Sequence, residues 1–398
     1  MIAESKPAHV PDDLVIDFDY FHPRTHQNDL HRAWKELQDQ SASDVVWTPH
    51  NGGHWVLLRG KDIHAFLRDI EHVEDRIVLL PPDRDFMMIP LAMNAPASLK
   101  YRALLNYDLS PRRVNALADA IRRIAGSLIE DLKQKGECEF IEDFANKLPT
   151  ILFMELCNLP MKDAPRLSYV TKQLSKPDGS MTLEEAIAEI MAYVTPFIVE
   201  RRETPGDDLL SRLANGVVDG ERVSFEEALS LTSIALFGGL DTVAASLGLA
   251  FRYLAEHPEL RATLTRDSSK LPAAVDEIFR RLSVPLTSRR VKADVEIAGV
   301  TLKAGDYVLL PLMLHGLDER EYPEPMEFDL DRKQHATSTF GNGYHMCPGR
   351  LLARTEMTIA IDEWLARIPE FAIPEGEEVT MLSGGSMIVN NLPLRWNN

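Results

Sequence analysis

One cysteine near the C-terminal end of the chain lies in a glycine-rich segment, Phe340-Gly-Asn-Gly-Tyr-His-Met-Cys347-Pro-Gly-Arg350. Gly341 and Gly343 permit positive φ and therefore tight turns. The apolar residues after Arg350 recur at helical spacing, which predicts that Cys347 precedes a helix N-terminus. The partial positive charge there favours a thiolate over a thiol. A single thiolate has too few partners for a zinc or iron–sulfur site, but it suffices as an axial haem ligand.

A second group of residues lies inside a long apolar helical pattern. Ser224 and Glu227 form the S-x-x-E capping box that starts a helix, and Pro258 ends the pattern after about His257. About 30 residues at 1.5 Å each give a helix roughly 45 Å long. Residues 229–249 are apolar on nearly every side, which predicts a helix buried in the middle of the molecule.

The segment Phe237-Gly-Gly-Leu-Asp-Thr242 within this helix breaks several local rules at once. Two glycines in a helix interior cost about 1 kcal/mol each relative to alanine, and a buried Asp241 beside Thr242 adds a desolvation cost. Such a concentration of penalties is typical of a functional site. The alternative is structural: Thr242 bonds back to the carbonyl four residues earlier, and Asp241 belongs to an ion pair.

The cysteine segment resembles the haem-ligand signature F-x-x-G-x-[RH]-x-C-x-G of the cytochrome P-450 monooxygenases. The matching residues are Phe340, Gly343, His345, Cys347 and Gly349. The resemblance implies haem b (iron protoporphyrin IX) as cofactor, Cys347 as the iron ligand, and Phe340, His345 and Gly349 among the cofactor-binding residues. The alternative is a buried structural cysteine beside a turn.

The helical segment is similar to the pattern [AG]-G-x-[DE]-T of the same family. The resemblance implies that Gly238 lies at the cofactor and helps to open the helix to dioxygen. It implies that Thr242 hydrogen-bonds peroxide at the iron and that Asp241 relays protons, so both would be catalytic. Leu240 would contact the substrate.

A third motif, E-x-x-R, places Glu277 and Arg280 on one face of a helix. The motif alone is a weak signal, but its order before Cys347 matches the family. Arg332 is the expected third partner. The resemblance implies a structural role, in which a buried ion network fixes the loop that carries the cysteine.

Within the family the chain resembles the bacterial camphor 5-monooxygenases over most of its length. By this resemblance Arg102, Arg289 and His345 bind the haem propionates, which need cationic or hydrogen-bonding partners. Thr287 stands where those enzymes have a propionate-contacting Asp. The shared runs are Asn51-Gly-Gly-His-Trp, Pro177-Asp-Gly-Ser-Met-Thr182, Gly238-Gly-Leu-Asp-Thr-Val243 and Gly316-Leu-Asp-Glu-Arg320.

The substrate pocket is expected to be more apolar than in the camphor enzymes. Phe86 occupies the position of a tyrosine that bonds the camphor ketone, and Leu91 replaces a small polar residue. A ketone there would lose a hydrogen bond worth about 0.5–1.5 kcal/mol. We therefore expect an apolar terpenoid or norisoprenoid substrate, ionone-like or camphor-like. The alternative is that Phe86 is an ordinary core residue.

Composition narrows the remaining possibilities. The 398 residues carry a formal net charge of −18, which argues against general nucleic-acid binding. Three cysteines without a C-x-x-C pair fit a reducing, cytoplasmic location. The first residues include no apolar run, and no run of about 18 apolar residues occurs, so no membrane association is expected.

The fold expected is mainly α, the cytochrome P-450 fold, as a single domain over residues 1–398. Small sheets accompany the helices, with the haem between the long central helix and the cysteine loop at 340–350. A β-hairpin around Asn51-Gly-Gly falls in a β-richer part at about 40–60, and residues 287–311 read as strands. Ser110 is expected to cap a further helix, with Pro111 at its first position.

Electrons must come from another protein, because the chain contains no flavin, nicotinamide or iron–sulfur fingerprint. The resemblance implies a [2Fe–2S] ferredoxin with its ferredoxin reductase, and O2 as the oxidant. Three alternatives are a peroxide-driven haem peroxygenase, a non-catalytic haem-binding sensor or carrier, and a structural helical protein. The last leaves the glycine, aspartate and threonine of the central helix unexplained.

Overall fold

The computed structural model describes residues 5–23, 29–75, 80, 88–175, 180–333 and 336–397. The chain forms two compact units. The first, called the sheet unit here, comprises Met1–Leu99, Asp276–Cys347 and Met381–Met387. The second, the helical unit, comprises Lys100–Val275, Pro348–Thr380 and Ile388–Asn398. The expectation of a single domain stays a prediction.

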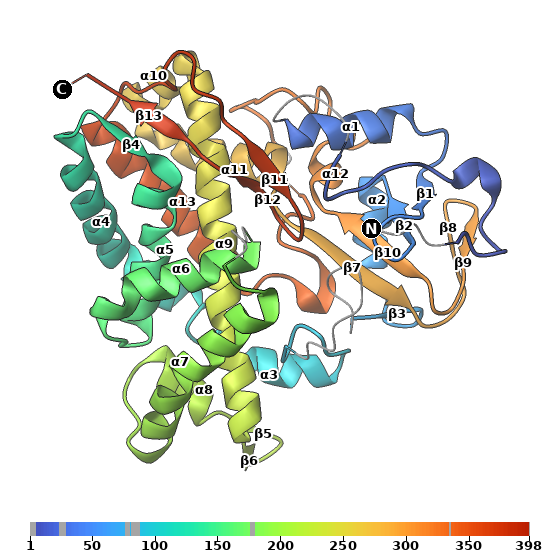
Figure 1. The fold of residues 1–398 in the computed structure, drawn as a ribbon, viewed down its shortest axis with the longest axis horizontal. Coiled ribbons are helices and arrows are strands. Elements are labelled where there is room, and N and C mark those ends of the chain that lie inside the picture. The colour runs from blue at the N-terminus through green and yellow to red at the C-terminus, as the bar shows by residue number, and fades with distance from the viewer. Residues whose placement is uncertain are drawn as a thin grey trace. The chain divides into compact units, whose positions relative to one another are not determined.

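A five-stranded sheet organises the sheet unit, with the strand order β1-β2-β10-β7-β3 (Figure 1). Neighbouring strands pair antiparallel, except that β10 runs parallel to β2. The sheet therefore joins the first fifth of the chain to residues near 300. Its strands are β1 (Val45–Thr48), β2 (His54–Leu57), β3 (Val73–Glu74), β7 (Leu286–Val291) and β10 (Tyr307–Pro311).

The predicted hairpin and the predicted strand region are both confirmed. β1 and β2 pair around Asn51, which has φ +53°, followed by two glycines with positive φ. In the later region β8 (Val295–Ile297) and β9 (Val300–Leu302) form a second hairpin. Positive φ at a turn favours glycine or asparagine because these residues tolerate the left-handed conformation.

Helices α1 (Leu30–Gln40), α2 (Gly60–Phe66) and α12 (Met313–Gly316) accompany this sheet, and two large tryptophans in its core, Trp34 and Trp55, are completely buried. The short helices η1 (Asp12–Leu14) and η5 (Gly343–His345) also lie in this unit. Burial of large apolar side chains such as these is the main stabilising contribution to a protein core.

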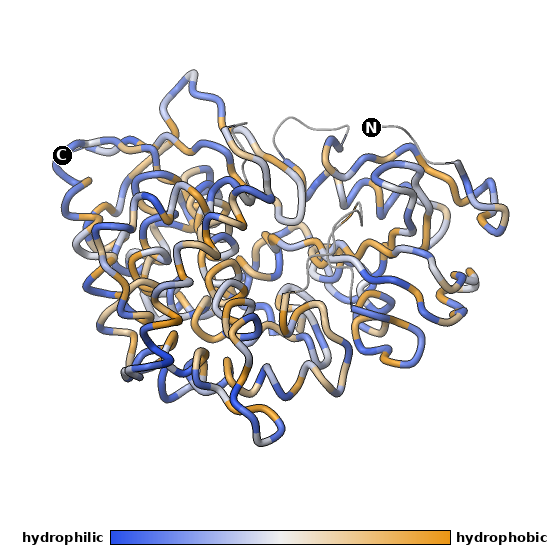
Figure 2. Tube along the Cα trace, turned by 60° about the horizontal axis from the view of Figure 1, so that its bottom comes forward, coloured by the Kyte–Doolittle hydropathy of each residue, from blue (hydrophilic) through white to orange (hydrophobic). Residues whose placement is uncertain are grey.

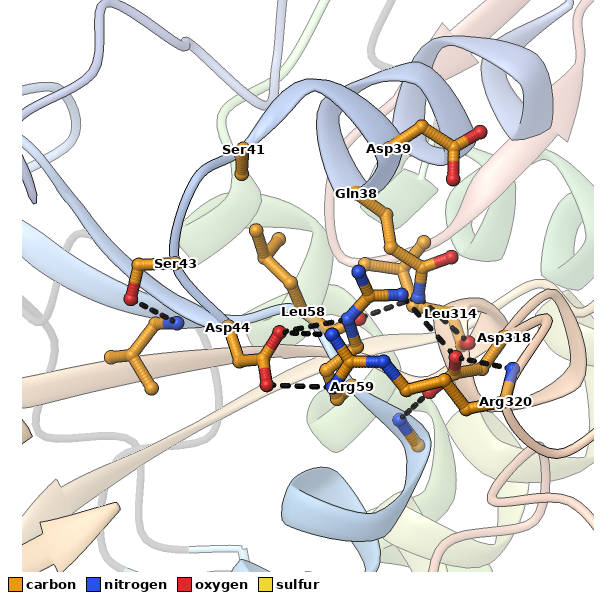
Figure 3. Close-up of polar contacts among 12 residues, drawn as sticks. Gln38, Asp39, Ser41, Ser43, Asp44, Leu58, Arg59, Leu314, Asp318 and Arg320 are labelled. Atoms are coloured by element: carbon orange, nitrogen blue, oxygen red, sulfur yellow. Dashed lines mark hydrogen bonds and ion pairs between the residues drawn. The ribbon is translucent and has the colours of Figure 1, made fainter. Parts of the chain in front are cut away.

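A polar network joins the segment after α1 to the segment after α12 (Figure 3). Arg59 Nε donates to Asp44 Oδ1 at 3.0 Å, and Arg320 donates to both oxygens of Asp44 at 2.7 and 2.9 Å. Asp318 accepts the backbone N–H of Gly60 at 2.9 Å. The network fastens two segments that lie far apart in the sequence.

The helical unit is built around α9 (Phe225–Glu256), the longest helix in Figure 1. The predicted capping box is present, because Ser224 Oγ accepts from the N–H of Glu227 and the Glu227 side chain accepts from the N–H of Ser224. α9 contacts α5, α6, α7, α8, α10 and α13. By length and composition α9 could cross a membrane, but much of it is buried among these helices, as in the core helix of a soluble protein.

The other helices of the chain are mostly amphipathic, and Figure 2 shows hydrophobic and hydrophilic residues alternating along their coils. They are α3 (Ala97–Asn106), α4 (Pro111–Lys133), α5 (Lys147–Leu156), α6 (Ala164–Ser175), α7 (Leu183–Glu203), α8 (Leu209–Ala214), α10 (Pro258–Arg266), α11 (Leu271–Arg281) and α13 (Arg350–Arg367), with the single turns η2 (Ile141–Ala145), η3 (Met161–Asp163) and η4 (Ser268–Lys270).

Short strands complete the chain: β4 (Glu137–Glu139), β5 (Val217–Val218), β6 (Glu221–Arg222), β11 (Met381–Ser383), β12 (Met387–Val389) and β13 (Pro393–Arg395). One local prediction needs correction. Pro111 is the first residue of α4, but the side chain of Ser110 does not cap this helix and instead donates to the carbonyl of Tyr107 at 2.8 Å. The proline alone fixes the start, because its preset φ suits the first helical position.

Candidate functional site

The loop that carries Cys347 is folded by its own backbone. Gly341 and Gly343 have φ of +69° and +63°, as predicted, and the N–H of Cys347 donates to the carbonyl of Phe340 at 2.7 Å. A Cβ atom on Gly343 would lie 3.0 Å from the carbonyl oxygen of Leu67, so a side chain there would be both strained and crowded. The loop therefore holds the cysteine by a tight turn.

Asn342 fastens this loop to α2. Its side-chain amide lies 2.7 Å from Nδ1 of His64, and its oxygen accepts the N–H of Gly343 at 3.0 Å. The ring of Phe340 packs on Phe279 of α11, with centroids 4.8 Å apart. These contacts anchor the loop at both ends of its turn.

The other two cysteines have a different environment. Cys157 is buried and Cys138 is half-buried. Burial raises the pKa of both thiols, with nearby carboxylates adding to the shift. Both therefore stay protonated and behave as small apolar side chains.

A buried cluster lies next to the cysteine loop in the same unit. Arg289 of β7 forms an ion pair from Nε to Oδ1 of Asp75 at 2.5 Å. The hydroxyl of Tyr344 donates to Oδ2 of Asp75 at 2.6 Å, and Nε2 of His345 lies 3.4 Å from the same oxygen. The guanidinium Nη1 of Arg289 also donates to Thr287 Oγ1 and to the carbonyl of Ser288. The structure thus brings together two of the three predicted propionate ligands.

Electrostatics keep Asp75 ionised. Burial alone would raise the pKa of Asp75, but the hydrogen bond with His345 and the positive charge of Arg289 outweigh it, so the pKa lies below its usual value. Burial lowers the pKa of Arg289, and Asp75 opposes that shift. An arginine remains charged in proteins, so the pair is ionic.

The donor set of this cluster fits a carboxylate-bearing cofactor. Nε2 of His345 donates to the carbonyl of Met93 at 2.8 Å, whereas Nδ1 is buried and has no hydrogen-bond partner among the described residues. Buried polar atoms are nearly always paired in folded proteins. A haem propionate beside His345 and Arg289 would supply the missing partner.

The third predicted propionate ligand, Arg102, belongs to α3 and to the helical unit. It is half-buried and makes polar contacts of its own. Its role at the cofactor stays a prediction. Gly349, the last residue of the predicted signature, is the N-cap of α13 and has φ −83°, so its backbone does not adopt the left-handed conformation.

The predicted ion network of Glu277, Arg280 and Arg332 is present. Glu277 and Arg280 are completely buried and form two parallel hydrogen bonds of 2.7 and 2.8 Å. Arg332 Nε lies 3.2 Å from Glu277 Oε1, and the N–H of Asp329 donates to Oε2 at 2.9 Å. Burial alone would raise the pKa of Glu277, but these partners hold it below its usual value.

In α9 the predicted oxygen-activating segment has an open side. A Cβ atom on Gly238 would meet no heavy atom of the described residues within 4 Å. Thr242 Oγ1 donates to the carbonyl of Gly238 at 3.0 Å, which is the back-bond that the structural alternative expects. Asp241 is half-buried rather than buried, so its desolvation is smaller than the sequence suggested.

A cavity of about 40 Å³ adjoins this segment within the helical unit, with room for a few water molecules. Asp241 and Leu240 line it on α9, and Lys172 lines it from α6. Lys172 Nζ donates to Glu142 Oε1 at 2.6 Å, and this pair is partly exposed to solvent. The remaining lining residues, polar and apolar, are Ile141, Asn146, Thr150, Ser168, Thr171, Ala244, Ala245, Ile388 and Val389.

The sequence did not predict some residues of the site, and one predicted residue lies outside the described parts of the chain. Phe86, the predicted substrate contact, falls outside the described residues. Asp75 and Lys172 belong to no motif, and Tyr344 occupies an unspecified position of the cysteine signature. The only available signal for Asp75 was the acidic pair Glu74-Asp75 after an apolar residue, facing the basic pair Arg289-Arg290 in a predicted strand.

Comparison with known proteins gives consistent results. The sequence profile of the family described as Cytochrome P450 matches residues 170–396. The chain is 32% identical over 403 residues to "Probable cytochrome P450 127A1" of Sinorhizobium fredii, covering 98% of this chain and 96% of that protein. It is 30% identical over 358 residues to the vitamin D(3) 25-hydroxylase of Pseudonocardia autotrophica, covering 87% and 88%.

Two crystal structures match over nearly the full length. CYP101C1 gives a TM-score of 0.93 at 39% identity, and CYP101J2 gives 0.92 at 37% identity. Each match covers 99% of this chain and 100% of the other. The mainly α fold with small sheets that the sequence predicts is confirmed by these two similarities.

Proposed function

Because the chain belongs to the cytochrome P450 family, whose members are haem monooxygenases, we propose that it hydroxylates an apolar terpenoid or norisoprenoid with electrons from a ferredoxin. Haem b, when bound, supplies the activation of O2 and the insertion of one oxygen atom into a C–H bond. The observation that carries the proposal is the glycine-turned loop holding Cys347. The protein supplies ligation, proton delivery and substrate orientation.

Cys347 is the thiolate that would hold the iron. Its loop is fixed by the backbone bond to Phe340 and by the anchoring of Asn342 on α2. Arg289 and His345 would hold the propionates through nitrogen atoms that have no hydrogen-bond partner among the described residues, Nη2 of Arg289 and Nδ1 of His345. Fixed donors lose little entropy on binding, so the cofactor is oriented as it binds.

Thr242 and Asp241 would serve proton delivery. The hydroxyl hydrogen of Thr242 is committed to the carbonyl of Gly238, so its oxygen is left to accept a hydrogen bond. Asp241 lines the cavity that also contains Lys172. A proton from solvent could enter at the exposed Glu142–Lys172 pair, cross the cavity on water and reach Asp241.

The substrate proposal rests on the lack of polar side chains at the predicted contacts. Leu240 is 3% exposed, and Phe86 has no hydrogen-bonding group. Spectral titration with β-ionone and with camphor tests this proposal. β-Ionone should bind at least as tightly as camphor, and much tighter binding of camphor would contradict it.

The electron donor is the other finer proposal. P450 enzymes take electrons from a redox partner, and the partner proposed here is a [2Fe–2S] ferredoxin with its reductase. The candidates for a basic docking surface, where complementary charge would speed association, are Arg102, Arg112, Arg113, Arg350 and Arg354; the alternative is that these are scattered solvated arginines. We propose a cytoplasmic location because three cysteines without a C-x-x-C pair fit a reducing compartment.

One experiment tests the whole assignment. The reduced protein with carbon monoxide should give the difference spectrum of a haem thiolate, and Cys347→Ala should abolish it. An unchanged spectrum with full haem content in the variant would refute ligation by Cys347. Robust turnover with hydrogen peroxide alone would favour the peroxygenase, and ligand-induced spectral change without oxygen consumption would favour the sensor.

A further inference from the structure

Two successive acid–arginine pairs cross the antiparallel strands β3 and β7. Val73 pairs with Val291 and Glu74 with Arg290, so the register carries Asp75 on to Arg289. Side chains alternate between the two faces of a sheet. Glu74 and Arg290 lie on the solvent side, 3.1 Å apart, whereas Asp75 and Arg289 are buried.

The buried pair has more partners than the exposed one. Both carboxylate oxygens of Asp75 are used, Oδ1 by Arg289 and Oδ2 by Tyr344, with His345 Nε2 beside Oδ2. The N–H of Asp75 donates to the side-chain oxygen of Asn94 at 2.8 Å. Both carboxylate oxygens of Asp75 are therefore engaged by side chains of the protein, and Asp75 acts on these neighbours.

Its neighbours do have capacity left. Arg289 uses Nε and Nη1, and no hydrogen bond from its Nη2 occurs within the described ranges. His345 uses Nε2, and its buried Nδ1 is without a partner there. Asp75 thus engages Nε of Arg289 and approaches Nε2 of His345, leaving the opposite atom of each for another carboxylate.

We propose that Asp75 is the positioning residue of the propionate site and the fixed negative charge that sets the reduction potential of the haem. The inference rests on the proposed role of Arg289 and His345 at the propionates. A buried charge acts strongly over the short distances of a haem pocket because the local dielectric is low. A negative charge there disfavours the ferrous state, since reduction adds an electron.

The test is the Fe(III)/Fe(II) potential of the haem-loaded protein. Asp75→Asn keeps the size of the side chain and removes its charge. The equilibrium should shift about tenfold toward the ferrous form, which corresponds to a rise of about 59 mV for one electron. The control is Glu74→Gln, which makes the same charge change one residue away on the exposed face. Its Fe(III)/Fe(II) equilibrium constant should stay within about twofold of the native value, because solvent and salt screen an exposed charge.

A second variant covers the case in which Asp75→Asn fails to fold, since it leaves a buried arginine unpaired. The double variant Asp75→Asn with Arg289→Gln removes both charges. The Fe(III)/Fe(II) equilibrium constant of this double variant should return to within about threefold of the native value, because the two charge changes are opposite in sign. If the double variant had the same reduction potential as Arg289→Gln alone, the charge of Asp75 would have no effect and the proposal would be overturned.

The single variant Arg289→Gln separates this inference from its premise. It should release haem to apomyoglobin faster and should lower the potential. If it changes neither property, the propionate assignment is wrong. If it changes both while Asp75→Asn leaves the potential unaltered, the propionate assignment stands and the role of Asp75 is refuted.

Discussion

Two buried arginine–carboxylate clusters in the sheet unit differ in how completely their donors are used. Arg280 places all five N–H groups: two on Glu277 and three on the carbonyls of Gly316, Pro325 and Glu327. Arg289 binds Asp75 and two oxygens of its own strand, with no recorded bond from Nη2 in the described parts of the chain.

We propose that the difference separates a structural cluster from a binding cluster. Arg280 has a partner for every one of its donors, so a change at any of these partners removes a hydrogen bond from it. Arg289, which has a donor without a partner among the described residues, can still bind a ligand. On our proposal, the same chemistry of arginine against carboxylate serves stability at Arg280 and ligand recognition at Arg289.

The largest expected effect comes from breaking the complete cluster. Arg280→Leu leaves the carboxylate of Glu277 buried and poorly compensated, so the free energy of unfolding should fall by about 3–5 kcal/mol. Urea unfolding followed by circular dichroism measures the change. Arg123→Leu, which removes an exposed partner of Glu155, is the control and should cost less than about 1 kcal/mol. Equal losses of unfolding free energy in the two variants would show that the buried cluster contributes no more to stability than an exposed ion pair.

Asp241 extends the comparison to the helical unit, where it lines a cavity. Asp241→Asn cannot transfer protons, so the rate of product formation should fall by about 10²-fold with substrate affinity unchanged. Oxygen uptake and product yield with reduced ferredoxin measure this effect. Asp163→Asn is the control, because this aspartate accepts a hydrogen bond from Tyr193 in the same unit and does not line the cavity. A normal rate in Asp241→Asn would remove Asp241 from the proton path.

Breaking the incomplete cluster should affect the cofactor more than the fold. Arg289→Gln removes charged hydrogen bonds worth about 1.5–3 kcal/mol, so haem should dissociate roughly 10- to 100-fold faster. Transfer of haem to apomyoglobin gives the rate, and thermal unfolding of the apoprotein gives the stability. A large loss of apoprotein stability with normal haem retention would reverse the roles assigned to the two clusters.

Glu356 of α13 is a third case, a buried carboxyl without an ionic partner in the described part of the chain. Its Oε2 has no hydrogen bond among the described residues, and burial raises its pKa to about 8. The unfolded value is about 4.3. Because the folded pKa is the higher one, the contribution of Glu356 to stability is fully present below about pH 4 and is lost as pH rises toward 8, by up to about 1.4 kcal/mol per pH unit.

Glu356→Gln should therefore flatten the decline in stability between pH 5 and pH 8, as measured by urea midpoints. Glu363 lies two turns further along the same helix and is also buried, but it is paired with Arg122 and Arg367. Glu363→Gln should lower stability without flattening the pH profile. An unchanged slope in Glu356→Gln would show that this carboxyl is ionised in the folded protein.

The smallest effect is expected at the partly exposed network of Figure 3. Asp44→Asn weakens the bonds to Arg59 and Arg320, one of which is more than half exposed. Exposed ion pairs contribute about 0.2–1 kcal/mol, and salt screens them. Unfolding at low and high salt measures this contribution, and haem retention should not change. A loss above about 3 kcal/mol would place this network with that of Arg280.

Local sequence signals predicted much of the fold. The hairpin at Asn51, the capping box at Ser224 and the strands after Thr287 each depend on neighbouring residues, and each is found where expected. The Ser110 cap was wrong because its hydroxyl found a competing carbonyl three residues earlier. Such local competition leaves no mark in a sequence pattern.

The site was predictable where a motif fixes the spacing and not where separate segments meet. Cys347 and its glycines form one short segment, so their geometry follows from their order. Asp75 and His345 are brought together only by the pairing of β3 with β7 and by the turn of the loop. Likewise, the half-exposure of Asp241 depends on how the helices around α9 pack, which no single segment specifies.

The parallel pairing of β2 with β10 has a consequence for biosynthesis. Trp55 lies beside Val308, so the central strand pair joins positions about 250 residues apart. At a translation rate of roughly 5–20 residues per second, the early hairpin leaves the ribosome roughly 10–50 s before its partner exists. During that interval the edge of β2 is an unprotected template for another nascent chain. Expression at a lower temperature, or together with a chaperone that covers this strand edge, should therefore raise the yield of folded protein.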